Sequence, residues 1–552
     1  MQHHPTRSSG HIRAPVALVL AAALAASGCM RRVETRLPGP PVSRVPADDG
    51  NRNDGNRNDG RDATAGRLQY TPILASPPMA LPQPAREFRG VWIATVENID
   101  WPSKPGLSTE QQKAELITLL DEAARLHLNA IVFQVRPAAD AIYASAVEPW
   151  SRYLTGETGR APAPFWDPLE FAIDEAHARG MELHAWFNPF RASTTRAQLS
   201  DPQHITRRRP DLVVPYGTKQ WLDPGLPEAR QYSLRVIEDV VRRYDVDGIH
   251  LDDYFYPYIE QDSRGRNIPF PDDATYAGYR ASGGTMSLGD WRRDNINTFV
   301  RDMYRGVHAA KPWVKVGISP FGIWRPGSPA GVRGLDAYSE IYADARTWLR
   351  NGWLDYIAPQ MYWLADAQYQ PYNDLVSWWA EQNIEGRQLF VGNASFKLNN
   401  TGWSPNELVR QVEMTRALPG VNGNIFFSAS SLLRNPNGLR ELLSSESYQA
   451  TALIPEMPWL DGGRAVIRPT ASVAIDERER LITVEWQRVA QSQAYVLRTR
   501  TRGEWSVAIV PGTASAHTVA FDVAPEIITL SAVGRSGGES APVVFRSSSA
   551  GE

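Results

Sequence analysis

From about Arg89 onward, short apolar runs alternate with longer stretches in which apolar residues recur every three or four positions. The short runs are typical of buried strands, and the longer stretches are typical of amphipathic helices. The expected strands are Gly90–Val96, Ala130–Val135, Glu182–Phe187, Gly248–Leu251, Val314–Ile318, Tyr356–Ala358, Leu389–Val391 and Asn424–Phe427. The expected helices are Thr109–Leu126, Pro168–Arg179, Pro227–Tyr244, Trp291–Ala310, Tyr338–Asn351, Asn373–Asn383, Pro405–Leu418 and a short one within Gly438–Ser445.

Eight strand–helix repeats in succession predict a (β/α)8 barrel, the TIM-barrel arrangement of the α/β class. An open doubly wound sheet is the structural alternative. That fold would be favoured by a glycine-rich GxGxxG after the first strand, and none is present there. We therefore predict a barrel over residues 86–457.

The pattern changes near Pro458, where short alternating runs replace the strand–helix repeats. These runs are Ala471–Ile475, Leu481–Trp486, Ala494–Thr499, Trp505–Ile509 and Ile527–Val533. Turn residues separate them, which predicts a small all-β sandwich over residues 465–548. The segment resembles a fibronectin type III module, because Trp486 and Tyr495 lie on successive expected strands. Such a module usually serves as a spacer or a binding unit.

The first residues carry an export signal. Arg7 and Arg13 precede the apolar run Ala14–Ala26, which is too short to span a bilayer and leads into Cys29. Cys29 is the only cysteine of the chain, so it has no disulfide partner. The segment resembles a bacterial lipoprotein signal over residues 1–29, with lipid on Cys29 and a place on the periplasmic face of the outer membrane. A plain secretory signal with an incidental cysteine is the alternative.

Residues 30–85 are rich in Pro, Gly, Asn and Asp and include the repeat NRNDGNRNDG at Asn51–Gly60. Such a segment cannot bury enough apolar surface to fold, so we predict a disordered tether. The net charge of −3 gives no indication of nucleic-acid binding. Membrane contact is expected through the lipid anchor only.

Active residues of a barrel lie where strands end and loops begin. Polar and aromatic side chains gather at these positions, although a structural role would explain any single one of them equally well. The candidates for substrate binding are Glu97, Arg136, His184, Trp186, Asn188, Arg191, His250, Trp324, Gln360, Tyr362, Trp363 and Asn393. Indole rings can stack on sugars, and the amides and guanidinium groups can bond hydroxyl or N-acetyl groups. Trp101 and Trp403 are further candidates for stacking.

Asp252 and Asp253 end the fourth expected strand, within VDGIHLDDYFYP at 246–257. Strand alternation places His250 and Asp252 on one face. Two carboxyl groups there are costly to bury unless they are paired or functional, and a capping aspartate with a salt bridge is the structural alternative. DGIHLD at Asp247–Asp252 is similar to the DGFRxD strand of amylase-type barrels. That similarity implies Asp252 as nucleophile or charge stabiliser, His250 as its neighbour and an outward Asp247.

Glycoside hydrolysis needs a second carboxyl group, and its identity is open. Amylase-type barrels place a glutamate after the fifth strand, where this chain has Ser319. Asp253 and Asp140 are the preferred candidates, followed by Glu97 and Asp366. A metal site built from His184, His250 and Asp252 is an alternative, but no metal and no cofactor are expected.

Five motifs together resemble the glycosyl-hydrolase-like 10 family. They are REFRGVWIATVENIDWP (86–102), QVRPAADAIYAS (134–145), HAWFNPFR (184–191), GIHLDDYFYP (248–257) and DYIAPQMYW (355–363). The resemblance covers about residues 86–445 and implies an envelope glycosidase acting on glycan strands. The expected substrate is peptidoglycan stripped of stem peptides, cleaved during cell-wall remodelling or division, with divisome or other envelope proteins as partners. The alternatives are a non-catalytic glycan-binding lipoprotein and a hydrolase of another exported polysaccharide.

Overall fold

The computed structural model describes residues 68–73, 80–399 and 402–549. The expected signal peptide with Cys29, and the expected tether over residues 30–67 and 74–79, lie outside these residues. Within the described part of the chain, no helix is both long enough and apolar enough to cross a bilayer.

In the described residues, eight parallel strands close into a barrel, which confirms the predicted fold. Around the ring they are β2 (Phe88–Ile93), β3 (Ala130–Arg136), β4 (Glu182–Phe187), β8 (Gly248–Leu251), β9 (Lys315–Ile318), β10 (Tyr356–Ile357), β12 (Gln388–Asn393) and β13 (Gly423–Phe426). The ring is closed because β10 pairs with β12 and β13 pairs back with β2. A short strand, β11 (Gln360–Met361), follows β10 and also pairs with β12.

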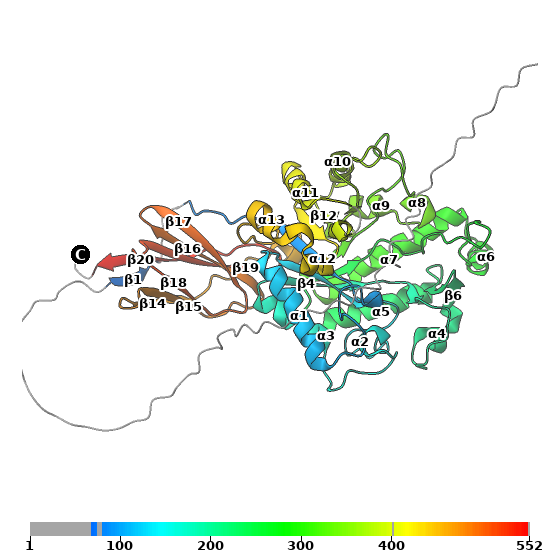
Figure 1. Cartoon of the computed structure of the whole chain (residues 1–552), viewed down its shortest axis with the longest axis horizontal. Coiled ribbons are helices and arrows are strands. Elements are labelled where there is room, and N and C mark those ends of the chain that lie inside the picture. The colour runs from blue at the N-terminus through cyan, green and yellow to red at the C-terminus, as the bar shows by residue number, and fades with distance from the viewer. Residues whose placement is uncertain (1–67, 74–79, 400–401, 550–552) are drawn as a thin grey trace, which may run out of the picture. The chain divides into compact units, whose positions relative to one another are not determined.

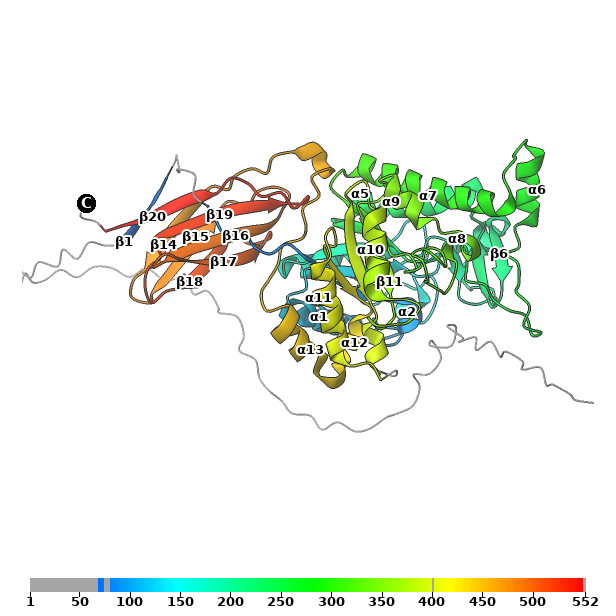
Figure 2. The same cartoon turned by 90° about the horizontal axis from the view of Figure 1, so that it is seen from above.

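Helices surround the barrel on its outer side (Figures 1 and 2). In chain order they are α1 (Thr109–Arg125), α3 (Pro168–Ala178), α5 (Pro227–Arg243), α7 (Leu288–Ala310), α9 (Ala345–Arg350), α10 (Tyr372–Gln382), α11 (Pro405–Ala417), α12 (Ala429–Arg434) and α13 (Leu439–Leu442). The longer helices bury the face that carries their apolar repeat. In α5, for example, Ala229, Val236 and Val240 are buried at helical spacing.

The expected helix over residues 338–351 is divided in two. α8 (Ala337–Glu340) ends before Tyr342, which has a left-handed φ of 56°. A new helix, α9, then begins after Asp344, whose side chain accepts a hydrogen bond from the Thr347 amide. The break is therefore explained by a backbone reversal followed by an aspartate cap.

Long insertions follow the carboxyl ends of two neighbouring strands. After β4, a small antiparallel sheet forms from β5 (Arg191–Ser193), β6 (Val213–Tyr216) and β7 (Lys219–Leu222). After β8, the chain runs through α6 (Asp273–Ala281) before it reaches α7. These insertions add surface at the end of the barrel where active residues are expected.

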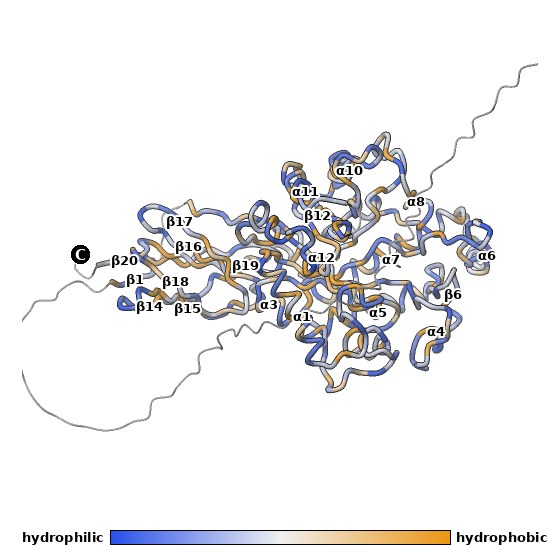
Figure 3. Tube along the Cα trace, viewed as in Figure 1, coloured by the Kyte–Doolittle hydropathy of each residue, from blue (hydrophilic) through white to orange (hydrophobic). Residues whose placement is uncertain are grey.

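The C-terminal region consists of two antiparallel sheets whose apolar side chains form one core. Its strands are β14 (Ala471–Asp476), β15 (Leu481–Trp486), β16 (Ser492–Thr501), β17 (Glu504–Pro511), β18 (Ala516–Ala520), β19 (Ile527–Gly534) and β20 (Val543–Ser549). One sheet has the order β14-β15-β18, and the other includes β19, β16 and β17. Val484 from the first sheet and Leu497 and Leu530 from the second belong to the shared core. Hydrophobic stretches along these strands are visible in orange in Figure 3.

One strand of this region comes from the expected tether. β1 (Leu68–Pro72) pairs antiparallel with β20, and the Tyr70 hydroxyl donates to the Pro525 carbonyl at 2.6 Å. The pairing satisfies an otherwise open sheet edge, and Tyr and Thr in LQYTP favour an extended strand. The structure therefore differs from the expected tether over residues 68–72.

Candidate active site

Asn188 and Asp252 meet at the carboxyl end of the barrel. Phe187 of β4 and Leu251 of β8 are partners in the parallel ladder, and each of the two polar residues follows its strand by one position. The Asn188 amide Nδ2 donates to both carboxylate oxygens of Asp252, at 3.1 and 3.0 Å. Its Oδ1 accepts from the Arg191 backbone N–H at 2.7 Å. The amide is thereby held in a single orientation.

The Asp252 carboxyl group is nearly inaccessible and has a strongly perturbed pKa. Burial is the largest cause that raises this pKa, the positive charge of Arg191 lowers it, the negative charge of Asp253 raises it, and the net pKa is about 7. The amide of Asn188 and the indole of Trp186 lower it. A carboxyl group with a pKa near neutrality can both donate and accept a proton under ordinary conditions.

Asp253 is also buried, and its carboxyl group faces a different set of partners. The Tyr258 hydroxyl donates to Asp253 Oδ2. Burial raises the pKa of Asp253, while bonding from Tyr258 and Gln360 lowers it. The pKa of Tyr362 is raised by burial and then by the charge of Asp253, which places this phenol close to the carboxyl pair. The charge of Asp253 is also one of the causes that raise the pKa of Asp252, so ionisation of Asp253 disfavours ionisation of its neighbour.

Arg191 supplies the positive charge of the site. Its Nε donates to the Pro137 carbonyl at 2.8 Å, and its Nη1 donates to the Tyr254 hydroxyl. The guanidinium carbon lies 5.6 Å from the centre of the Tyr254 ring. These contacts fix the cation beside the carboxyl pair, where it favours their ionised forms.

Arg136 and Asn393 are directed away from the mouth of the barrel. Arg136 is fully buried, forms a bidentate pair with Glu148 at 2.6–3.0 Å, and donates to the carbonyls of Asn188 and Pro189. It therefore supports the backbone at Asn188. Asn393 donates to the Tyr372 hydroxyl at 3.2 Å and to Gln411 Oε1 at 2.9 Å, both on outer helices. Inward Gly392 precedes it, so strand alternation points Asn393 outward.

His184 and His250 lie inside the barrel, below the carboxyl pair. Both rings bond the Tyr356 hydroxyl through Nδ1, at 2.8 and 2.9 Å. Nε2 of His184 bonds Glu182, and Nε2 of His250 accepts from Trp92. Both nitrogens of each ring are thus engaged. Within the residues that the structure describes, no group of three His, Cys, Asp or Glu side chains is arranged to hold a metal ion.

The remaining candidate carboxyl groups occupy other surroundings. Asp140 accepts from the Ala138 amide at 2.9 Å, and burial raises its pKa to about 6. It lines a small recess with Arg152 and Tyr153. Glu97 is exposed on a 3-10 turn after β2, and Asp366 is exposed and paired with Arg410. None of these three shows a contact with Asp252 in the described structure.

The candidate tryptophans differ in their surroundings. Trp186 is only 7% exposed and lies beside Asp252. Trp324 stacks on Trp378 at 5.7 Å and donates to Asp344, so it packs between loop and helix. Trp363 makes an edge contact with Phe321 at 5.6 Å. Trp101 is fully buried and donates to the Gln112 carbonyl, which identifies a core role.

Sequence reasoning missed three aromatic residues of the site region. Tyr258 bonds Asp253, Tyr254 bonds Arg191, and Tyr356 joins the two histidines. The run YFYPY directly after the aspartate pair was a usable signal for the first two. Tyr356 gave no signal beyond its inward position on the sixth strand.

The chain is similar in sequence to known proteins. The family described as "Glycosyl hydrolase-like 10" matches residues 87–407. "Glycosyl hydrolase YngK" of Bacillus subtilis (strain 168) is 42% identical over 426 residues, which cover 75% of this chain and 82% of that protein. "Glycosyl hydrolase DigH" of Escherichia coli (strain K12) is 37% identical over 387 residues, which cover 64% of this chain and 86% of that protein.

Among solved structures, the glycoside hydrolase domain of PgaB (BpsB) from Bordetella bronchiseptica aligns with a TM-score of 0.44 at 16% identity, over 66% of this chain and 100% of that domain. The catalytic domain of β-amylase from Paenibacillus polymyxa aligns with a TM-score of 0.46 at 12% identity, over 66% and 99%. The family match extends over more than half of the sequence and spans the barrel strands that carry Asn188, Asp252 and Asp253. This chain therefore belongs to the glycosyl hydrolase-like 10 family.

Proposed function

We propose that this chain is a glycoside hydrolase whose reaction is carried out by Asp252 and Asp253. The observation that carries the proposal is the pair of adjacent, buried carboxyl groups with raised pKa values at the carboxyl end of the barrel. Buried acids without a compensating ion pair are costly to stability, and such cost is concentrated at functional sites.

The pair is suited to the two tasks of glycoside hydrolysis. One carboxyl group gives a proton to the departing oxygen as the bond to the anomeric carbon breaks. The other, ionised, stabilises the positive charge at that carbon or accepts a proton from the water whose hydroxyl group bonds to the carbon. Mutual repulsion between Asp252 and Asp253 favours one proton shared by the pair near neutral pH. The charge of Arg191 and the amide of Asn188 favour the ionised state of Asp252.

The proposed substrate is a glycan strand of the cell envelope, above all peptidoglycan stripped of stem peptides during cell-wall remodelling or division. Tyr362, which is partly exposed, offers aromatic surface beside the carboxyl pair, and such a surface suits a series of pyranose rings. Arg191 offers a cation that could meet the lactyl carboxylate of muramic acid. The sequence resemblance and the expected anchor support this substrate over another exported polysaccharide.

We further propose that Cys29 carries lipid and holds the protein on the periplasmic face of the outer membrane. Metabolic labelling with a palmitate analogue tests this proposal. Label is expected on the wild-type protein in the membrane fraction and should be lost with Cys29→Ser. Equal labelling of both proteins would contradict a lipid anchor.

The hydrolase proposal is tested with soluble Cys29→Ser protein on sacculi that an amidase has stripped of stem peptides. Release of soluble oligosaccharides, identified by mass spectrometry, is the expected result, with little release from untreated sacculi. Co-sedimentation without any fragment between pH 5 and pH 8 would favour the non-catalytic glycan-binding alternative. A panel of other bacterial polysaccharides separates peptidoglycan from the exported-polysaccharide alternative.

A further inference from the structure

A chain of five hydrogen-bonded side chains runs through the barrel interior below Asp252. Trp92 Nε1 lies 3.1 Å from His250 Nε2, and His250 Nδ1 lies 2.9 Å from the Tyr356 hydroxyl. The same hydroxyl lies 2.8 Å from His184 Nδ1, and His184 Nε2 lies 2.9 Å from Glu182. Trp92 is 2% exposed and the other four side chains are fully buried.

The donors and acceptors in this hydrogen-bonded series allow only one direction of donation, from Trp92 towards Glu182. An indole N–H can only donate, so His250 Nε2 must accept from Trp92. Burial lowers the pKa of His250 well below its usual value, so the ring is neutral and carries its hydrogen on Nδ1. That hydrogen goes to the Tyr356 oxygen, and the Tyr356 O–H must then donate to His184. His184 in turn donates through Nε2 to the carboxylate of Glu182.

The upper end of this hydrogen-bonded series lies on β8, the strand that Asp252 follows. His250 precedes Asp252 by two positions on the same strand face, and its ladder partner on β4 is Trp186. Trp92 and Trp186 belong to one buried cluster. The Trp92 ring also lies 6.1 Å from Phe427, and a side chain at Gly392 would begin 3.1 Å from it. The indole of Trp92 is therefore closely packed inside the barrel, in the same cluster as Trp186.

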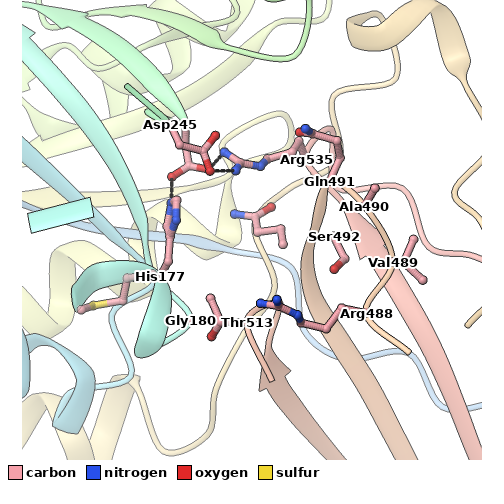
Figure 4. A pocket seen from close by; sticks show the side chains of 14 residues that line it. His177, Gly180, Asp245, Arg488, Val489, Ala490, Gln491, Ser492, Thr513 and Arg535 are labelled. Carbon is pink, nitrogen blue, oxygen red and sulfur yellow. Dashed lines mark hydrogen bonds and ion pairs between the residues drawn. The ribbon is translucent and has the colours of Figure 1, made fainter. Parts of the chain in front are cut away.

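The lower end of the chain is fixed by the C-terminal sheets. Glu182 accepts from Lys315 Nζ at 2.6 Å and from the Gln493 side chain. Lys315 Nζ also donates to the Arg535 carbonyl at 2.9 Å. The Arg535 guanidinium binds Asp247 at 2.7 Å and Asp245 at 2.6 Å, beside a cavity of about 400 Å³ that is lined by barrel and sheet residues (Figure 4). The buried Lys315–Glu182 pair is thus completed from outside the barrel.

We propose that His250 and Tyr356 are positioning residues for the hydrolysis, because they hold the indole of Trp92 in one orientation below Asp252 and Trp186. This inference rests on the proposed function. His250 and Tyr356 act through Trp92 and do not touch the substrate. The histidine that the amylase comparison implied as a neighbour of the nucleophile therefore orients an aromatic ring beneath it.

Tyr356→Phe tests the inference because it removes only the hydroxyl that joins the two histidines. The matched control is Tyr372→Phe, which removes an equally buried hydroxyl bonded to Thr415 and Asn393 on the outer side of the barrel. In protein labelled with 15N-tryptophan, the indole signal missing from Trp92→Phe identifies Trp92. That signal is expected to shift with Tyr356→Phe and to stay in place with Tyr372→Phe.

Hydrolysis is measured in the same variants at a temperature where each is folded. Tyr356→Phe is expected to lower kcat by up to about a hundredfold with a small change in KM, whereas Tyr372→Phe keeps the wild-type kcat. A shifted indole signal with an unchanged kcat would overturn the positioning role while the proposed function stands. An unshifted signal would show that the hydrogen-bonded series through Tyr356 does not hold the Trp92 indole, and it would overturn the inference. Absence of hydrolysis by the wild-type protein would remove the proposed function and this inference together.

Discussion

Asn188 contacts both carboxylate oxygens of Asp252, with its amide nitrogen 3.1 Å from one and 3.0 Å from the other. The contact follows from the register of β4 and β8, because each residue comes one position after paired strand ends. Burial and the charge of Asp253 disfavour the ionised carboxyl group, whereas the charge of Arg191 and the Asn188 amide favour it. The balance leaves the pKa of Asp252 at about 7.

Asn188→Ala should raise the pKa of Asp252, because it removes a donor that stabilises the carboxylate. A hydrogen bond to a charged group contributes about 1.5 kcal/mol or more, which corresponds to about one pKa unit. The limb of the pH–kcat profile that reports on Asp252 should move by that amount to higher pH. Asn351→Ala, at the exposed end of α9, should leave the profile in place. An unmoved profile in Asn188→Ala would show that this contact does not set the pKa.

Asp252→Asn should stabilise the protein at alkaline pH. Because the pKa of Asp252 is about 7 in the folded protein and about 4 in the unfolded chain, ionisation destabilises the fold as pH rises between these values. Asparagine cannot ionise, so the gain should approach at most about 4 kcal/mol at pH 8. It should vanish below pH 4, where both forms are neutral. Thermal denaturation at pH 8 and pH 4 measures the difference, and an equal or lower Tm of the variant at pH 8 would contradict the raised pKa.

Arg535→Ala should destabilise the barrel although Arg535 lies outside it. Burial raises the pKa of Asp247, but the charges of His177 and Arg535 outweigh it and hold this pKa well below its usual range. Removing one partner of a buried ion pair costs about 3 kcal/mol or more. Arg478→Ala, at an exposed pair, should cost close to nothing. The Tm of both variants checks this, and equal effects would show that Arg535 is not needed for the barrel.

The sequence predicted the barrel because every strand is a compact apolar run, from Ala130–Arg136 to Gly423–Phe426, and is followed by a helical repeat. It also placed Asn188 and Asp252 correctly at strand ends, since the end of an apolar run is visible without knowing its neighbours. The residues 68–72 were not expected to form a strand. Their partner, β20, lies at the other end of the chain, and no local pattern reports such a pairing.

Side-chain direction could not be predicted near irregular strand ends. A register shift between Gln134 and Arg136 disturbs the alternation of β3, and Arg136 pairs with Glu148 in the core. His184 and His250 face inward as alternation requires. Their common partner Tyr356 depends on how three separate strands are staggered around the ring, which short sequence patterns do not contain.

The most direct test of the account compares Asp252→Asn with the wild-type protein on amidase-treated sacculi. Asp121→Asn is the matched control, since this carboxyl group lies on the surface of α1 and pairs with Arg179. We expect Asp252→Asn to lower kcat by at least about a hundredfold while the variant stays folded and still sediments with sacculi, and we expect Asp121→Asn to keep full activity. Undiminished release of soluble glycan fragments by Asp252→Asn would contradict this expectation.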